Sequence, residues 1–138
     1  MGNNYNIIAI FDKTFENILM CKREKEPYKG LYNFVGGKIE YDECSIDAAY
    51  RELREETGIT KDDIYLFHLM DFKYYLNNST LEVYVGKLNR HVTLKEELNS
   101  LEWISSTENF FPLDKFAGDG NIGHIMNHIL LNKDTLFK

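Results

Sequence analysis

The 138-residue chain has few cysteines, no long apolar run and no excess of basic residues. Its two cysteines are too few for a disulfide scaffold, so Cys21 and Cys44 are expected to be free thiols in a reducing cytosol. No basic N-terminal region is followed by a long apolar run, so neither a signal peptide nor a membrane span is expected. The net charge of −6 argues against a nucleic-acid polymer as partner, because the basic footprint for one is missing. A small polyphosphate remains compatible, since bound metal and a few local cations can balance its charge.

The length fits one domain, residues 1–138, with a sizeable core. No repeat, low-complexity tract or linker interrupts it. The polar stretch 22–30, broken by Pro27 and Gly30, predicts an exposed loop. Apolar patterning and turn residues predict strands at 5–11, 18–21, 31–35, 64–76, 81–88 and 101–104. Apolar residues at the spacing of a helix over 121–131 predict an amphipathic helix whose apolar positions are Ile122, Ile125, Ile129 and Leu130. Strands around one central helix, closed by another, suggest an α/β sandwich.

The most informative segment is the acidic stretch 51–56, RELREE. In a helix, Glu52, Glu55 and Glu56 stand at i, i+3 and i+4 and share one face. Three carboxylates on one face repel one another, whereas a hard divalent cation turns that cost into a gain. The stretch is interpreted as a metal site; the alternative is a solvated acidic helix of an ordinary kind.

The ends of this helix are also visible in the sequence. Ser45 is expected to be the N-cap, Asp47 favours the first turn, and Gly58 is expected to end the helix in a left-handed conformation. Gly36-Gly37, ahead of the helix, allows a sharp backbone turn and leaves main-chain groups accessible to a ligand. The apolar stripe expected to pack on a core consists of Ile46, Ala49, Tyr50 and Leu53.

The whole pattern resembles the Nudix box: Gly37, five residues, Glu43, seven residues, Arg51-Glu52-Leu53, one residue, Glu55-Glu56, one residue, Gly58-Ile59. The chain is therefore similar to the Nudix hydrolases. The resemblance implies an α/β/α sandwich with a mixed β-sheet, and cleavage of a pyrophosphate bond in a nucleoside diphosphate derivative with Mg²⁺ or Mn²⁺. It further implies that the metal ligands are Glu52, Glu55, Glu56 and the carbonyl of Gly36. Arg51 would hold Glu43 in place, because a guanidinium grips a carboxylate in fixed geometry.

The general base and the substrate contacts are less well defined. Glu52 is one candidate for the base, and Glu97 lies where MutT-like members carry one; the alternative for Glu97 is a charged surface loop. The strand containing Phe34 resembles the one that enters the box in MutT-like enzymes. Asp119 and Asn121 resemble the region where those enzymes hold a purine base, although Asn121 is equally suited to be a helix N-cap.

The favoured function is a cytoplasmic, metal-dependent pyrophosphohydrolase, monomer or homodimer, acting on a (d)NTP or 8-oxo-dGTP. Dinucleoside polyphosphates, ADP-ribose and nucleotide sugars are the alternative substrates. ADP-ribose is the weaker of these, because Tyr74 and Tyr75 stand where members that cleave it tend to place a proline. The rival from another class is a nucleotide-sensing Nudix module without turnover, but such modules usually lose a box glutamate and none is missing here.

Overall fold

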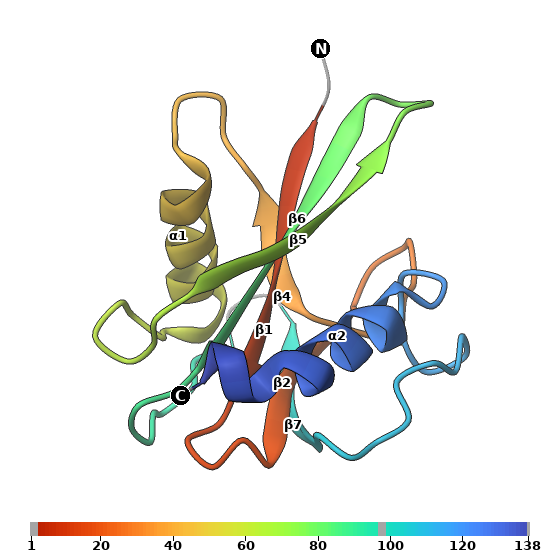
Figure 1. The fold of residues 1–138 in the computed structure, drawn as a ribbon. Coiled ribbons are helices and arrows are strands. Elements are labelled where there is room, and N and C mark those ends of the chain that lie inside the picture. The colour runs from red at the N-terminus through yellow and green to blue at the C-terminus, as the bar shows by residue number, and fades with distance from the viewer. Residues whose placement is uncertain (1–2, 97–98, 138) are drawn as a thin grey trace.

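A computed structural model of the chain describes residues 3–96 and 99–137. The strands are β1 (Asn4–Phe11), β2 (Asn17–Lys22), β3 (Tyr32–Asn33), β4 (Val35–Lys38), β5 (Phe67–Tyr74), β6 (Ser79–Lys87) and β7 (Ser100–Ser105). They form one mixed sheet around β1, which runs parallel to β6 and antiparallel to β2 and β4 (Figure 1). The helices are α1 (Ser45–Thr57) and α2 (Asn121–Leu136). The predicted α/β fold with a mixed sheet is confirmed.

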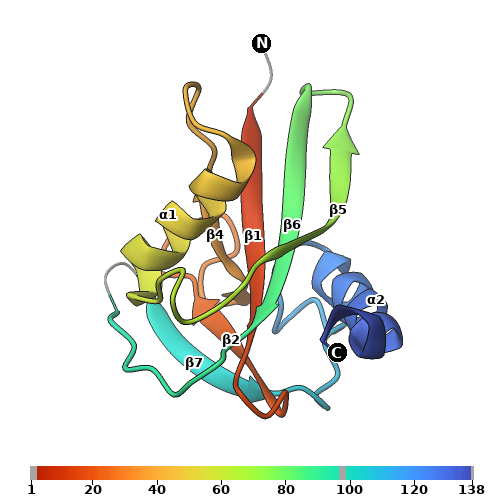
Figure 2. The ribbon, with the colours of Figure 1, turned by 60° about the vertical axis from the view of Figure 1, so that its left-hand side comes forward.

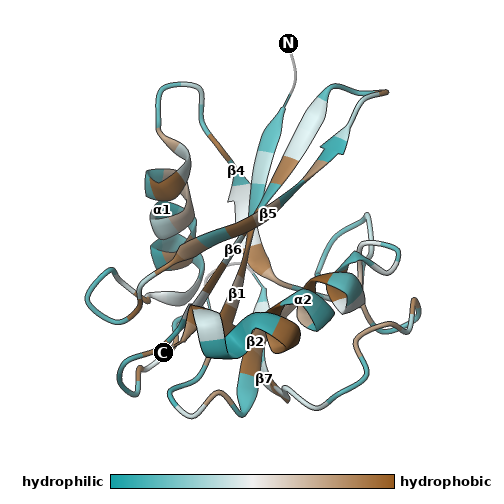
Figure 3. Cartoon of the chain, in the orientation of Figure 1, coloured by the Kyte–Doolittle hydropathy of each residue, from teal (hydrophilic) through white to brown (hydrophobic). Residues whose placement is uncertain are grey.

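The alternation of side chains along β1 builds a core on each face of the sheet. Ile8 and Ile10 lie in one buried cluster with Leu53 of α1. Phe11, on the other face, lies in a second cluster with Ile125 of α2. Figure 2 shows the two helices on opposite sides of the strands. In Figure 3 the C-terminal half of β1 is hydrophobic, while its N-terminal half, which approaches the glycines of β4, is polar.

Some predicted elements have different bounds in the structure. The strand expected over 31–35 is divided into β3 and β4, so that Phe34 stands between two short strands. Helix α2 continues to Leu136, and Leu130, predicted to be apolar-face, is 38% exposed. In α1, Ile46 is exposed and Ala48 is buried in its stead.

The predicted helix caps were partly wrong. Cys44, not Ser45, is the N-cap of α1, and the Ser45 hydroxyl donates instead to Glu82 of the adjacent sheet at 3.0 Å. Asn121 is the first residue of α2 rather than its N-cap; that position belongs to Gly120, whose φ of 98° suits glycine. Gly58 ends α1 with φ 81°, as predicted.

Both cysteines are free thiols, Cys21 buried and Cys44 exposed, in agreement with the expectation. Among the described residues, no helix combines the length and the apolar character that crossing a bilayer requires.

Candidate active site

Two glycines of β4 allow close approach to its neighbours, Gly36 to β1 and Gly37 to Glu52 of the acidic helix. Gly36 and Gly37 pair with Ile7 and Asn6 of β1. A Cβ on Gly36 would meet the Asn6 carbonyl oxygen at 2.1 Å, and a Cβ on Gly37 would meet the Glu52 carboxyl group at 2.6 Å. A side chain is therefore excluded at Gly36 by fixed backbone atoms, whereas at Gly37 it would displace the Glu52 carboxylate, which rests on this part of the β4 backbone.

Arg51 ties the acidic residues together. Its Nε donates to Glu43 Oε2 at 2.9 Å and its Nη2 to Glu43 Oε1 at 2.5 Å, which is a bidentate pair. Its Nη1 donates to Glu52 at 3.0 Å and to Glu55 at 3.1 Å. Nη2 also donates to the Lys38 carbonyl. The hydrogen bonds from Arg51 lower the pKa of Glu43 to about 2.

Glu56 has a different environment. Its carboxylate accepts a hydrogen bond from the Gly36 N–H at 2.9 Å. Burial nevertheless raises the pKa of Glu56 to about 7, and the charges of Glu52 and Glu55 push in the same direction. Burial likewise raises the pKa of Glu52, although Arg51 opposes that shift. Glu56 is thus a carboxylate whose ionised form gains from a nearby cation.

The box glutamates do not gather closely around one point. Glu55 points to Arg51 and its side chain is 52% exposed, while Glu56 turns toward Gly36. Within residues 3–96 and 99–137, the side chains that bring three metal-ligand atoms within 4.8 Å of one another are His68, Asp71 and Glu82. These side chains already have hydrogen-bond partners, because His68 contacts Asp71 at 2.6 Å and Glu82 accepts from the Tyr84 hydroxyl at 2.7 Å.

The donor set along α1 and β4 still fits a divalent cation. Glu52, Glu56 and the Gly36 carbonyl offer oxygen ligands, which Mg²⁺ and Mn²⁺ prefer. The charge of a bound cation would lower the pKa of Glu56 and so offset the rise that burial causes. Glu55 can join these ligands from the same helix face by leaving Arg51, because its side chain is half exposed.

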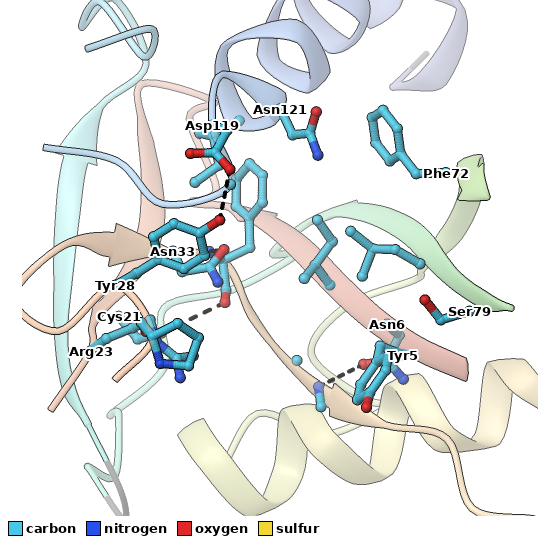
Figure 4. A pocket seen from close by; sticks show the side chains of 18 of the residues that line it. Tyr5, Asn6, Cys21, Arg23, Tyr28, Asn33, Phe72, Ser79, Asp119 and Asn121 are labelled. Carbon is cyan, nitrogen blue, oxygen red and sulfur yellow. Dashed lines mark hydrogen bonds between the residues drawn. The ribbon is translucent and has the colours of Figure 1, made fainter. Parts of the chain in front are cut away.

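A pocket of about 820 Å³ opens beside this group (Figure 4). Gly36, Gly37 and Glu56 line it, and so do Asp119 and Asn121, which Figure 4 shows beside the start of α2. A nucleotide-sized molecule fits a pocket of this volume. Among the described residues that line it, the cations are Arg23 and Lys73.

The structure brings most of the predicted site residues together. Asp119, Asn121 and Phe34 all line the pocket, although Phe34 is only 2% exposed. Arg51 and Glu43 form the expected pair just outside it. Glu97 lies outside the described residues, so its predicted role as a base stays a prediction.

Arg23 and Asn6 are among the pocket residues that were not predicted. Arg23 follows β2 directly, and nothing in the charged stretch 22–26 distinguishes it from its neighbours. Asn6 is 1% exposed; its Oδ1 accepts from the Gly37 N–H at 3.1 Å, and its Nδ2 has no hydrogen-bond partner in the described part of the chain. A buried asparagine inside the apolar strand YNIIAIF is a signal that sequence inspection could have used, since buried amides need partners.

The family model of the NUDIX domain matches residues 3–126, which is most of the chain and includes the whole box. The chain belongs to the Nudix family. Members of this family typically depend on divalent metal ions, and the oxygen donors of α1 and β4 agree with that.

Similarity to individual Nudix proteins is more limited. The chain is 40% identical over 53 residues to a CTP pyrophosphohydrolase of Escherichia coli, covering 38% of this chain and 39% of that protein. It is 27% identical over 111 residues to the NAD-capped RNA hydrolase NudC of Haemophilus influenzae, covering 80% of this chain and 40% of NudC. The chain therefore spans only about two fifths of these curated relatives.

Solved structures share the fold over nearly the full length. A Caenorhabditis elegans Ap4A hydrolase superposes with a TM-score of 0.76 at 16% identity, covering 96% of this chain and 98% of that one. The NUDIX domain of Shewanella oneidensis NrtR, complexed with ADP ribose, gives 0.75 at 14% identity, with coverages of 96% and 89%. At these identities the likeness shows the fold alone.

Proposed function

We propose that this Nudix protein is a metal-dependent pyrophosphohydrolase that cleaves a (d)NTP or an oxidised dNTP such as 8-oxo-dGTP. The observation that carries the proposal is that one pocket joins Glu56 and the Gly36-Gly37 backbone to Asp119 and Asn121. A phosphate chain at the glutamates and a base at the start of α2 would occupy its two sides. The complete set of box glutamates favours turnover over a sensing role.

The metal would be Mg²⁺ or Mn²⁺, held by Glu52, Glu55, Glu56 and the Gly36 carbonyl. When bound, the cation would polarise a phosphoryl oxygen and orient the attacking water. The protein itself supplies the positioning. Arg51 holds Glu52 and Glu55, and the Gly36 N–H holds Glu56 at 2.9 Å. Glu52 is also a candidate base, because its carboxylate is mostly buried and lies against the backbone of Gly37.

Arg23 is proposed to bind the phosphate chain. It lines the pocket, and its charge lies close enough to Glu56 to lower the pKa of that carboxyl, against the larger effect of burial. Its Nε donates to the Pro27 carbonyl at 2.6 Å, so a backbone group of the loop that follows β2 holds the guanidinium in place. A guanidinium matches phosphate oxygens in a bidentate manner. Phosphoryl transfer depends mainly on such charge neutralisation and positioning.

The base is proposed to lie against Asp119 and Asn121, which offer a carboxylate and an amide for hydrogen bonds to its edge. The pocket also presents aromatic side chains to a base, among them Tyr28 and Phe72. ADP-ribose is the second candidate substrate, because a similar structure is a NUDIX domain complexed with it.

The test is a hydrolysis screen with Mg²⁺ of CTP, dGTP, 8-oxo-dGTP, Ap4A and ADP-ribose, with products separated by chromatography. We expect a nucleoside monophosphate and pyrophosphate from a triphosphate. Glu56→Gln should lower turnover by roughly a hundredfold or more, while Glu16→Gln, an exposed acid far from the box in sequence, should leave it unchanged. Hydrolysis of ADP-ribose alone would replace the first candidate by the second. Binding without turnover of any of these compounds would overturn the proposal.

A further inference from the structure

Two tyrosine hydroxyls join the base side of the pocket to distant segments. The Tyr28 hydroxyl donates to Asp119 Oδ2 at 3.0 Å, a bond visible in Figure 4. The Asn121 amide donates to the Tyr74 hydroxyl, also at 3.0 Å. Tyr28 lies in the loop after β2 and Tyr74 is the last residue of β5, so the turn before α2 is held from two directions. All four residues line the pocket.

The backbone at these positions shows that the arrangement is built rather than incidental. Asp119 has φ 53° and Tyr28 has φ 65°, a left-handed conformation that non-glycine residues rarely adopt. Gly118 and Gly120, on either side of Asp119, have φ 82° and 98°. Strained residues of this kind persist when surrounding contacts hold them, and they concentrate at functional sites. Here the two strained residues are partners in one hydrogen bond, although 91 positions separate them.

The hydroxyl groups are the parts of the tyrosines that make these contacts. A tyrosine hydroxyl, with an ordinary pKa of about 10, is a donor at physiological pH, and the hydrogen bond to Asp119 raises the pKa of Tyr28 further. Tyr74 is partly exposed, at 42%, whereas its neighbour Tyr75 is 87% exposed and does not line the pocket. Removing either pocket hydroxyl would leave Asp119 or Asn121 free to take other rotamers, and thus with less preference for one edge of a base.

We propose that Tyr28 and Tyr74 are positioning residues that set the base selectivity of this pocket by holding Asp119 and Asn121 through their hydroxyl groups. The inference rests on the proposed function, in which the base lies against Asp119 and Asn121. The tyrosines act through those two residues. A base that makes hydrogen bonds along its edge gains from acceptors and donors fixed in advance, because less side-chain ordering accompanies binding.

The experiment measures kcat and KM for CTP and UTP, and for dGTP and dITP, with wild type, Tyr28→Phe and Tyr74→Phe. Within each pair the bases differ at their hydrogen-bonding edge. We expect each variant to raise KM about two- to tenfold with little change in kcat, as the loss of one hydrogen bond would do. We also expect the kcat/KM ratio within at least one pair to move toward one. Tyr75→Phe is the matched control and should change neither quantity.

Double variants test whether the tyrosines act through their partners. Tyr28→Phe should have no further effect in an Asp119→Ala background, and Tyr74→Phe none in an Asn121→Ala background. Additive effects in both backgrounds, or ratios that stay at the wild-type value while KM rises, would overturn the proposal.

Dissociation constants for CMP, UMP, dGMP and dIMP, measured by calorimetry, separate this inference from the proposed function. If wild type hydrolyses no nucleotide but the phenylalanine variants still shift the CMP/UMP or dGMP/dIMP ratio, the proposed turnover fails and the positioning role stands. If hydrolysis occurs and no ratio shifts in either assay, the positioning role fails alone.

Discussion

Arg51 holds three acids of the box near one another through ion pairs. Its guanidinium contacts Glu43, Glu52 and Glu55, and so offsets repulsion that would otherwise disfavour the helix. The bidentate pair with Glu43, which lies before α1, also fixes the direction of the guanidinium. A lysine has the charge but lacks the planar fork that makes these contacts together.

Arg51→Lys is therefore expected to lower kcat/KM by about tenfold or more, the equivalent of roughly 1.4 kcal/mol of lost positioning. Steady-state kinetics with the substrate found in the screen would measure it. The matched control is Arg54→Lys, an exposed change on the same helix, which should alter kcat/KM little. Equal losses in the two variants would show that the fork of Arg51 is not what matters.

Glu43→Gln should produce a pH-dependent change in stability. The folded-state pKa of Glu43, about 2, lies below its usual value of 4.5, so the ionised carboxylate stabilises the folded protein above pH 4.5. That stabilisation is lost as the pH falls from 4.5 toward 2. Urea unfolding at several pH values should show the largest gap between wild type and variant above pH 4.5 and a shrinking gap below it. A gap that is constant with pH would contradict the assigned cause.

Among the secondary-structure elements, β4 matters most to the site, because Gly37 leaves room for the Glu52 carboxylate of α1 to lie against it. A Cβ added at Gly37 would meet only the end of a flexible side chain, whereas at Gly86 of β6 a Cβ would meet the Tyr65 carbonyl at 2.7 Å. Gly37 and Gly86 therefore have different roles. Gly37 maintains the position of Glu52, and Gly86 maintains the packing of the sheet.

Gly37→Ala should reduce kcat by about ten- to a hundredfold with a small loss of stability, since Glu52 can rotate away at little cost. Gly86→Ala should instead lower the free energy of unfolding by about 1–3 kcal/mol. Activity assays and thermal unfolding of both variants test the contrast. Full activity in Gly37→Ala would indicate that Glu52 need not lie on the β4 backbone.

In the molecule as a whole, β1 belongs to both cores. Ile8 and Ile10 face α1, and Ala9 and Phe11 face α2, so neither helix can leave without exposing one face of the same strand. The site lies where the polar first half of β1 meets β4, at the edge of this shared core. Stability on both sides of the sheet is thus expected to be coupled.

Leu53→Ala in α1 and Ile125→Ala in α2 each remove a fully buried side chain and should each cost about 2–5 kcal/mol. Because the cores share β1, each variant should still unfold in one transition, seen alike by circular dichroism and by fluorescence of Trp103. Leu131→Ala, at a residue that is 83% exposed, should have little effect. Separate transitions for the two faces would contradict the shared core.

The sequence predicted the acidic helix, its glycine end and most of the strands, because these depend on local spacing. It did not predict that Cys44 and Gly120 are the N-caps, since Ser45 turns to Glu82 and Asn121 to Tyr74. Those partners lie 37 and 47 positions away in the chain, where local patterns carry no information. Arg23 was missed for the same reason, because only the folded loop places it near Glu56.

Binding of a divalent cation by the glutamates of α1 can be measured by Mn²⁺ titration followed by electron paramagnetic resonance. The structure offers a rival in His68, Asp71 and Glu82, so wild type, Glu56→Gln and Glu82→Gln should be compared. We expect Glu56→Gln to lose Mn²⁺ binding and Glu82→Gln to retain it. Retention in Glu56→Gln together with loss in Glu82→Gln would place the cation at His68, Asp71 and Glu82 and refute the proposed site on α1.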